Sequence, residues 1–192
     1  MSAERWQRLL TEPAGLSDEA GFAPWFDQVA TRLLCGSRLV AGGTAHRFTE
    51  VEAYYHGKGH LDLFAHRDPI QKGTGVWYFH RTAGVLRGGS FMGVDLAFGG
   101  PDAFGGMLIR GLSVEPEGRL IDGPSLTVDH LIDCTGAGSV SALARAVDGK
   151  PAWDESNPMR LEWLEEAECH SVLRTARVGL SLKRHKLPDD PP

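Results

Sequence analysis

The chain has 192 residues, of which 42% are hydrophobic and 23% are charged, a composition typical of one ordinary soluble domain and not of a disordered chain. Its formal net charge is -5, whereas nucleic-acid-binding domains usually carry a basic face. The first residues, MSAERWQRLL, are not a basic region followed by an apolar run, and no stretch approaches the roughly 18 apolar residues of a membrane span. We therefore expect a cytoplasmic protein without a secretion signal or membrane span.

The cysteines, Cys35, Cys134 and Cys169, are odd in number and have no CxxC spacing. This pattern argues against a disulfide scaffold and against a cysteine zinc site, and it fits a reducing compartment. Buried, unpaired thiols are the default expectation for all three.

Two helices are expected before the first strand. Residues 1–20 are predicted to be a peripheral segment, in which a short amphipathic helix around Trp6 ends before Pro13. A second helix is predicted from Pro24 to Gly36, because proline suits the first helical position and glycine the end. Its apolar residues at helical spacing are Phe26, Val29, Ala30, Leu33 and Leu34.

A β-hairpin is predicted next, with strands at residues 38–41 and 46–55 around a Gly42-Gly43 turn. Alternation places Phe48, Glu50, Glu52 and Tyr54 on one face of the second strand. An unpaired buried carboxylate costs several kcal/mol, so Glu50 and Glu52 must either face water or serve a site.

A polar, His-rich loop at residues 56–75 is long enough to indicate a functional element. The rest of the chain reads as an antiparallel sheet followed by helices and returning strands. Strands are expected at 76–79, 91–98, 107–112, 160–168 and 171–182, and helices at 123–133 and 140–147, before a flexible tail at 183–192.

The segment EVEAY at residues 50–54, followed by Asp62 and Ala65-His66, resembles the alkyladenine (3-methyladenine) DNA glycosylase family, whose pattern is E-T-E-A-Y, then Asp, then Ala-Ser-His. Further matches follow in order. GMLIRGL at 106–112 is similar to the family's V-L-I-R-A-L strand, GPSL at 123–126 to its G-P-G/S-K-L helix start, and RVG at 177–179 to its late R-V/I-G. The matches span about residues 48–180. They imply one mixed α/β domain over 1–192, with a curved, mainly antiparallel sheet and flanking helices.

The resemblance also implies a monofunctional N-glycosylase that excises a modified purine, as in base excision repair of DNA. Glu52 would activate water and stabilise an oxocarbenium-like sugar, with Arg110 orienting the carboxylate. Tyr54 and His66 would sandwich the base, and Tyr78 would supply a further stacking wall. No cofactor or metal is expected, and the protein is expected to be a monomer.

Two departures from the family pattern bear on the substrate. Asp95 stands where the family has an Asn that screens purines, and an ionised carboxylate only accepts hydrogen bonds, so we predict a base with N–H or amino donors. Val85 and Gly88 stand at the hairpin positions where the family inserts a bulky residue into the duplex. The lack of a bulky residue at these positions, together with the net charge of -5, adds single strands, free nucleosides and nucleotides to duplex DNA as candidate substrates.

Three alternatives are open. The chain could be a relative that binds a nucleic acid or nucleobase without cleaving it. It could be a metallohydrolase that uses His56, His60, Asp62 and His66 as ligands. Glu52 could instead be a solvent-facing strand residue, and Arg110 a structural ion-pair partner of Glu50 or Glu52.

Overall fold

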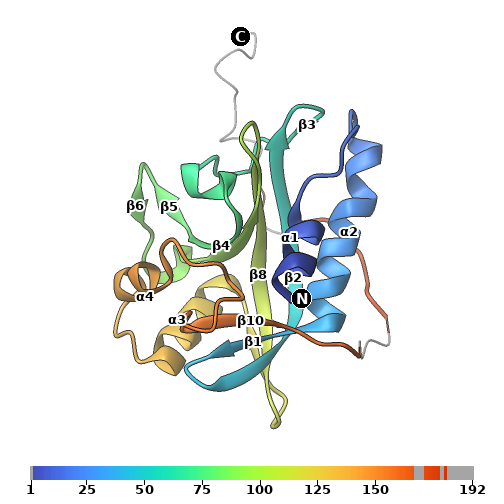
Figure 1. Cartoon of the computed structure of the whole chain (residues 1–192). Helices are drawn as coiled ribbons and strands as arrows, with labels where there is room; N and C mark the ends of the chain where they lie inside the picture. Colours follow the sequence, from blue (N-terminus) through green and yellow to red (C-terminus); the bar gives the residue numbers. More distant parts are fainter. Residues whose placement is uncertain (1, 167–170, 178–179, 181–192) are drawn as a thin grey trace.

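A strongly curled antiparallel sheet forms the centre of the computed structural model, with strands in the order β10-β1-β2-β8-β7-β4 (Figure 1). β3 pairs with β2, β9 pairs with β8, and β5 and β6 form a separate hairpin. The structure describes residues 2–166, 171–177 and 180. Helices flank the sheet, so the expected mixed α/β fold with a curved antiparallel sheet is confirmed.

The strands are β1 (Ser37–Ala41), β2 (Thr44–Gly57), β3 (His60–Leu61), β4 (Thr74–Phe79), β5 (Arg81–Thr82), β6 (Val85–Leu86), β7 (Val94–Phe98), β8 (Phe104–Val114), β9 (Arg119–Asp122) and β10 (Met159–Trp163). The helices are α1 (Ser2–Leu10), α2 (Glu19–Gly36), α3 (Pro124–Thr135) and α4 (Val140–Val147), with short 3-10 turns η1 (Pro69–Lys72) and η2 (Gly89–Phe91).

The first helix is present where the sequence predicts it, but it is not peripheral. Trp6 and Leu10 are fully buried, and the Trp6 ring lies 5.0 Å from that of Trp163 on β10. Large aromatic side chains contribute heavily to a core. α1 is therefore a part of the core. The expectation that residues 1–20 are peripheral is wrong for residues 2–10, which form this helix.

α2 begins earlier than the proline signal predicts, because Asp18 caps it by accepting a hydrogen bond from the Gly21 amide at 2.9 Å. Pro24 lies inside the helix and denies a partner to the Ala20 carbonyl, which is tolerated because Ala20 is exposed to water. The predicted end at Gly36 is confirmed.

The two faces of β2 have different neighbours, as the alternation predicts. Tyr55 packs against Phe22 and Trp25 of α2, with ring separations of 5.3 and 5.4 Å. On the opposite face, His46 contacts His130 of α3. The sheet is thus held between α1 and α2 on one side and α3 and α4 on the other, an arrangement visible in Figure 1. Glu52 and Tyr54 share the face of His46.

The returning part of the chain differs from the expectation. β10 ends at Trp163, and residues 171–177 form neither a helix nor a strand. The tail predicted at 183–192 and the Val178-Gly179 part of the family match lie outside the described residues.

The cysteine expectation is corrected at one position. Cys35 is buried and disulfide-bonded. The expectation of a reducing compartment rested on unpaired cysteines, so it loses that basis. Cys134 is a free thiol, and Cys169 lies outside the described residues. Separately, none of the helices in the described ranges combines the length and apolar character that crossing a bilayer requires.

Candidate active site

A single row of paired residues crosses four strands of the sheet. Glu52 of β2 is opposite Leu108 of β8, Leu108 is opposite Asp95 of β7, and Asp95 is opposite Tyr78 of β4. Directly opposed residues point to the same side of a sheet. The row therefore places three of the predicted site residues, Glu52, Asp95 and Tyr78, on one face.

Glu52 is at the centre of a first cluster of polar groups. Its side chain is only 6% exposed, so the alternative of a solvent-facing strand carboxylate is excluded. The Tyr54 hydroxyl donates a hydrogen bond to Glu52 Oε2 at 2.8 Å, and Arg110 Nη1 lies 3.3 Å from Oε1. Partners on both oxygens lower the cost of burying this charge.

Arg110 bridges the two acidic residues of the EVEAY segment. Its Nε lies 3.2 Å from Glu50 Oε1, while Nη1 faces Glu52. Neither contact is a well-directed hydrogen bond, and within the described ranges the buried Nε has no hydrogen-bond acceptor. Arg110 is thus both an ion-pair partner, as the structural alternative expected, and a donor able to make a further hydrogen bond.

Tyr54 has one face of its ring covered by Arg177, whose guanidinium carbon lies 4.5 Å from the ring centroid. Arg177 is held by Asp62 through two hydrogen bonds and by the Ala53 carbonyl at 3.2 Å. Asp62 also accepts from the Tyr55 and Phe64 amides. The matched residues Asp62 and Arg177 therefore fix the position of the Tyr54 ring.

His66, Tyr78 and His80 form a second cluster, around Asp95. The His66 ring lies 4.3 Å from the His80 ring and 5.9 Å from the Tyr78 ring. His80 Nε2 is 2.7 Å from Asp95 Oδ1, and the Gln71 amide donates to Asp95 Oδ2 at 3.1 Å. The structure thus brings His66, Tyr78 and Asp95 together as predicted, and it adds His80 and Gln71.

The two clusters meet above Gly106. This glycine is opposite Tyr54, and a Cβ added to it would lie 2.4 Å from Asp95 Oδ2 and 2.8 Å from Gln71 Nε2. Any larger residue would occupy the space that the Asp95 carboxylate fills. Tyr54 and His66 are not in ring contact within the described part of the chain, so the predicted sandwich of a base between them remains a prediction.

Burial sets the protonation of the aromatic groups. It raises the pKa of the Tyr54 phenol, with a further contribution from its hydrogen bond to Glu52, and it raises the pKa of Tyr78. Burial, followed by the neighbouring His80, lowers the pKa of His66 to about 4. At neutral pH both phenols are therefore protonated, and His66 is a neutral ring suited to stacking.

Asp95 does not offer a free oxygen to a substrate. Its side chain is 1% exposed, and both oxygens have internal partners. Direct recognition of a base by Asp95, as the sequence predicts, therefore requires Gln71 or His80 to give way. His80 follows β4 directly and lies two residues after Tyr78, a spacing that could have indicated that both side chains point to the same face.

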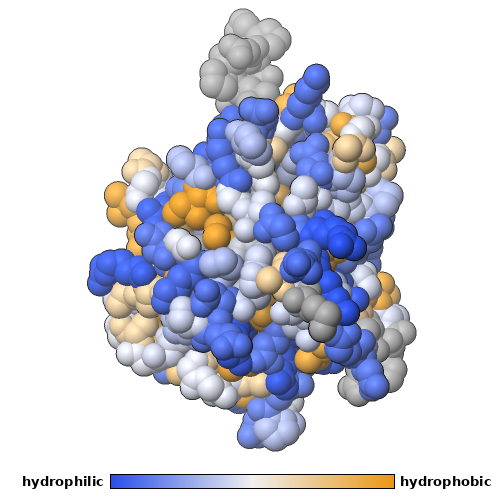
Figure 2. Space-filling model, in the orientation of Figure 1, coloured by the Kyte–Doolittle hydropathy of each residue, from blue (hydrophilic) through white to orange (hydrophobic). Residues whose placement is uncertain are grey.

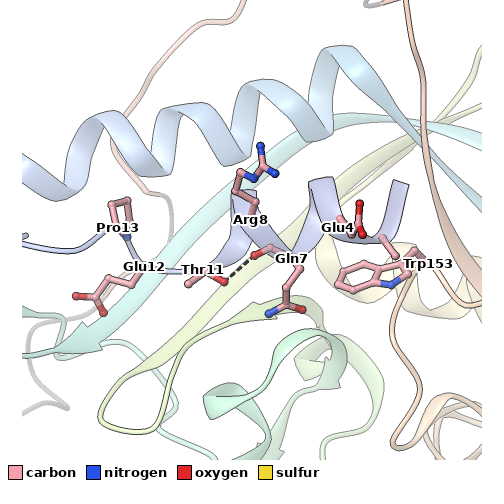
Figure 3. Close-up of a pocket in the computed structure, with 8 residues that line it drawn as sticks. Glu4, Gln7, Arg8, Thr11, Glu12, Pro13 and Trp153 are labelled. Atoms are coloured by element: carbon pink, nitrogen blue, oxygen red, sulfur yellow. Dashed lines mark hydrogen bonds between the residues drawn. The ribbon is translucent and has the colours of Figure 1, made fainter. Parts of the chain in front are cut away.

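One cavity in the surface is lined by residues of the first cluster, and another pocket lies away from both clusters. A cavity of about 590 Å³ is lined by Glu50, Glu52 and Asp62 together with residues 172–177. Figure 3 shows another pocket, along α1, where the Thr11 hydroxyl donates back to the Gln7 carbonyl at 2.6 Å and Trp153 forms one wall. The α1 pocket contains none of the predicted site residues.

The surface on the β5–β6 side of the molecule is mixed in character (Figure 2). The face in Figure 2 is mostly hydrophilic, with a hydrophobic patch on the β5–β6 side of the molecule. Val85, at the hairpin position where the family has an aromatic residue, is 70% exposed, and Gly88 has open space around it. Phe91, which follows in η2, is also 70% exposed. An aromatic side chain is thus present three residues after Gly88, although neither position matched to the family's hairpin residue is aromatic.

The metal-ligand set considered from sequence is not assembled. His56 Nδ1 lies 3.1 Å from the Asp62 carbonyl and His60 Nδ1 lies 2.8 Å from the Tyr55 carbonyl, so these rings are used in backbone contacts. Among the described residues, the groups whose ligand atoms lie within 4.8 Å of one another are His66–His80–Asp95 and His46–His130–Cys134.

Comparison with known proteins adds one relative. The chain is 25% identical over 173 residues to an uncharacterized protein of Acanthamoeba polyphaga mimivirus, covering 83% of this chain and 80% of the viral protein. No protein-family model matches the chain. No solved structure matches it either.

Proposed function

We propose that the protein hydrolyses the N-glycosidic bond of a modified purine. The observation that carries this proposal is the buried Glu52 carboxylate, held by Tyr54 and Arg110 on the sheet face that also carries the His66–Tyr78–His80–Asp95 cluster. A carboxylate and a group of aromatic rings side by side suit one sugar and one attached base.

The chemistry divides between the two clusters. As the bond from C1′ to the purine nitrogen breaks, its electron pair leaves with the base, and the sugar develops positive charge. Glu52 stabilises that charge and takes a proton from the water that forms the new C1′–O bond. Arg110 keeps the carboxylate in place, and the Tyr54 hydroxyl donates a hydrogen bond to Glu52 Oε2, the carboxylate oxygen that does not take the proton from water.

The base is assigned to the second cluster. The neutral His66 ring and the Tyr54 ring provide apolar faces for a flat heterocycle, whereas Tyr78, predicted as a further stacking wall, is fully buried and packs against His66. One face of Tyr54 is occupied by Arg177, which leaves the opposite face for the base. The net charge of -5 and the aliphatic Val85 at the hairpin favour a purine in a single strand or a free nucleoside over duplex DNA.

The test is base release from purines presented in three forms. Wild-type protein is incubated with double-stranded and single-stranded DNA containing hypoxanthine or an alkylated purine, and with the matching free nucleosides. Glu52→Gln should lower the rate of base release by about 10²-fold or more, the usual contribution of a positioned general base. Failure of every wild-type reaction would reject the enzymatic proposal.

Glu50→Gln is the matched control, because Glu50 lies two residues away and also pairs with Arg110, yet its side chain is 45% exposed. We expect it to lower the rate only a few-fold. Equal losses in the two variants would show that Arg110 pairing, and not a Glu52-bound water, carries the effect. Binding of a free purine without cleavage would support the alternative of a non-catalytic relative.

A further inference from the structure

A second group of potential metal ligands lies away from the proposed active site, where the start of β2 meets α3. His46 Nε2 and His130 Nε2 are 2.9 Å apart, and Cys134 Sγ is 3.4 Å from His130 Nε2 and 4.0 Å from His46 Nε2. His46 is fully buried, and Cys134 is a free thiol. Two imidazole nitrogens and one thiol sulfur, all of them atoms that can bind a transition metal, thus lie close together.

The orientation of His46 is fixed by its other ring nitrogen. Nδ1 lies 3.1 Å from the Leu39 carbonyl, which can only accept, so Nδ1 carries the proton. The lone pair of His46 is therefore on Nε2, which points to His130 and Cys134. A backbone carbonyl that holds the far nitrogen of a histidine is the usual support of a metal-binding imidazole.

The spacing of the other two donors follows from the helix. His130 and Cys134 are four residues apart in α3, so their side chains lie on the same face, towards β2. Zinc bonds of about 2.0–2.1 Å to nitrogen and 2.3 Å to sulfur place tetrahedral donors roughly 3.3–3.7 Å apart. The three observed separations, 2.9, 3.4 and 4.0 Å, need changes of only a few tenths of an ångström.

We propose that His46, His130 and Cys134 bind one zinc ion that joins β2 to α3. On binding, the Cys134 thiol releases its proton to solvent and the thiolate becomes the sulfur ligand, while a water molecule takes the fourth position. This assignment is independent of the proposed glycosidase activity.

The surroundings are compatible with a bound cation. Arg119 contributes positive charge near the three ligands, and Asp133 and Glu115 contribute negative charge. Burial lowers the pKa of His46 and of His130, so both rings are neutral near pH 7, as metal binding requires. Burial also raises the pKa of the Cys134 thiol, so the metal must displace that proton.

The position of the site indicates a structural role. His46 and Glu52 are six residues apart on one extended strand, which is roughly 20 Å at about 3.3 Å per residue. Zinc at this end of β2 therefore does not reach the reacting atoms of the proposed substrate. Its effect is on the attachment of α3 to the sheet, since a ligand that binds the folded chain stabilises it.

Metal content and Co²⁺ spectroscopy test the proposal on the full chain. Metal-free wild-type protein should bind one equivalent of added zinc, and Co²⁺ should give a thiolate-to-metal charge-transfer band together with tetrahedral d–d bands. Cys134→Ala, on the part-exposed face of α3, should lose the charge-transfer band and bind zinc at least tenfold more weakly. Zinc should raise the Tm of wild type, and raise it less in Cys134→Ala.

His80→Gln is the matched control, because it disrupts the other group of ligands, His66–His80–Asp95. It should keep the charge-transfer band and the zinc stoichiometry. The proposal would be overturned if Cys134→Ala still bound zinc with wild-type affinity while His80→Gln no longer bound it. A wild-type protein that takes up no zinc would also overturn it, and would leave the 2.9 Å contact as a hydrogen bond between two histidines.

Discussion

Glu52 and Asp95 are both paired with Leu108, from opposite sides of β8, and their side chains therefore stand on the same face of the sheet. Both carboxylates are nearly inaccessible to water, at 6% and 1% exposure. Their partners differ: Glu52 contacts a phenol and a guanidinium, and Asp95 contacts an imidazole and an amide. In the proposed reaction, Glu52 meets the sugar and Asp95 supports the base pocket.

Asp95→Asn should change both stability and substrate preference. The amide keeps one acceptor but directs an N–H at either His80 or Gln71, which leaves a buried group poorly paired, at a cost of about 1–3 kcal/mol in the free energy of unfolding. Urea unfolding measures that cost. If Asp95 also selects bases with N–H or amino donors, the variant should shift the ratio of base-release rates towards purines without them. An unchanged ratio would show that Asp95 acts only through His80.

Gly106→Ala should disrupt the junction between the two clusters. The added methyl group would lie 2.4 Å from Asp95 Oδ2, so the carboxylate must move away from its partners. We expect a loss of about 1–3 kcal/mol in unfolding free energy, measured by denaturant titration, and a loss of base release. Gly100→Ala is the control, because a Cβ there meets only open space. Similar effects of the two substitutions would argue against crowding at Gly106.

Stability should fall between about pH 6.5 and pH 4 through His66. Its pKa is lowered from 6.5 to about 4 in the folded protein, so over this window the unfolded chain binds a proton that the folded chain does not. Stability contributed by the neutral ring is therefore present above pH 6.5 and is lost as the pH falls towards 4. The pKa is lowered by about 2.5, so at about 1.36 kcal/mol per pKa unit the loss is at most about 3.4 kcal/mol.

The contribution of His66 is isolated by comparing unfolding free energies of wild type and His66→Asn at several pH values. The difference between the two proteins should shrink as the pH falls through this window. A difference that does not vary with pH would mean that His66 is not the titrating group.

Phe91→Ala should discriminate between substrate forms. This side chain is 70% exposed in η2, two residues before Gly93, whose carbonyl accepts from the His80 amide. It can stack on neighbouring bases of a strand, but a free nucleoside offers it nothing to stack on. We expect weaker binding of single-stranded substrate, by roughly 1–3 kcal/mol, and unchanged cleavage of the nucleoside. Val85→Ala serves as a control for the hairpin itself. Equal effects on both substrate forms would place Phe91 in the base pocket instead.

Alternation and chain order were sufficient to predict one half of the candidate site. The period-two pattern of β2 placed Glu52 beside Tyr54, and the ordered family matches connected them to Arg110, which the structure brings within 3.3 Å of Glu52. These predictions rest on local geometry that a strand cannot easily violate.

The other half depends on contacts between distant segments. His80 and Gln71 meet Asp95 only because β4, η1 and β7 fold together, and single-sequence patterns carry no record of such pairings. The buried position of Trp6 also needed the tertiary structure, since tertiary contacts override propensity. The same reason explains why His46 was not grouped with His130 and Cys134. The capping of α2 by Asp18 is a local signal between residues three apart, and the prediction started the helix at Pro24 instead.

The ion pair between Arg177 and Asp62 joins residues 115 positions apart in the chain. During synthesis, Asp62 and Tyr54 leave the ribosome long before Arg177 does. The ring of Tyr54 can therefore be fixed by Arg177 only after residue 177 has been made, although the sheet strands around it are complete earlier. A nascent chain stalled before Arg177 should consequently contain a folded sheet in which the Tyr54 ring is not yet held in place.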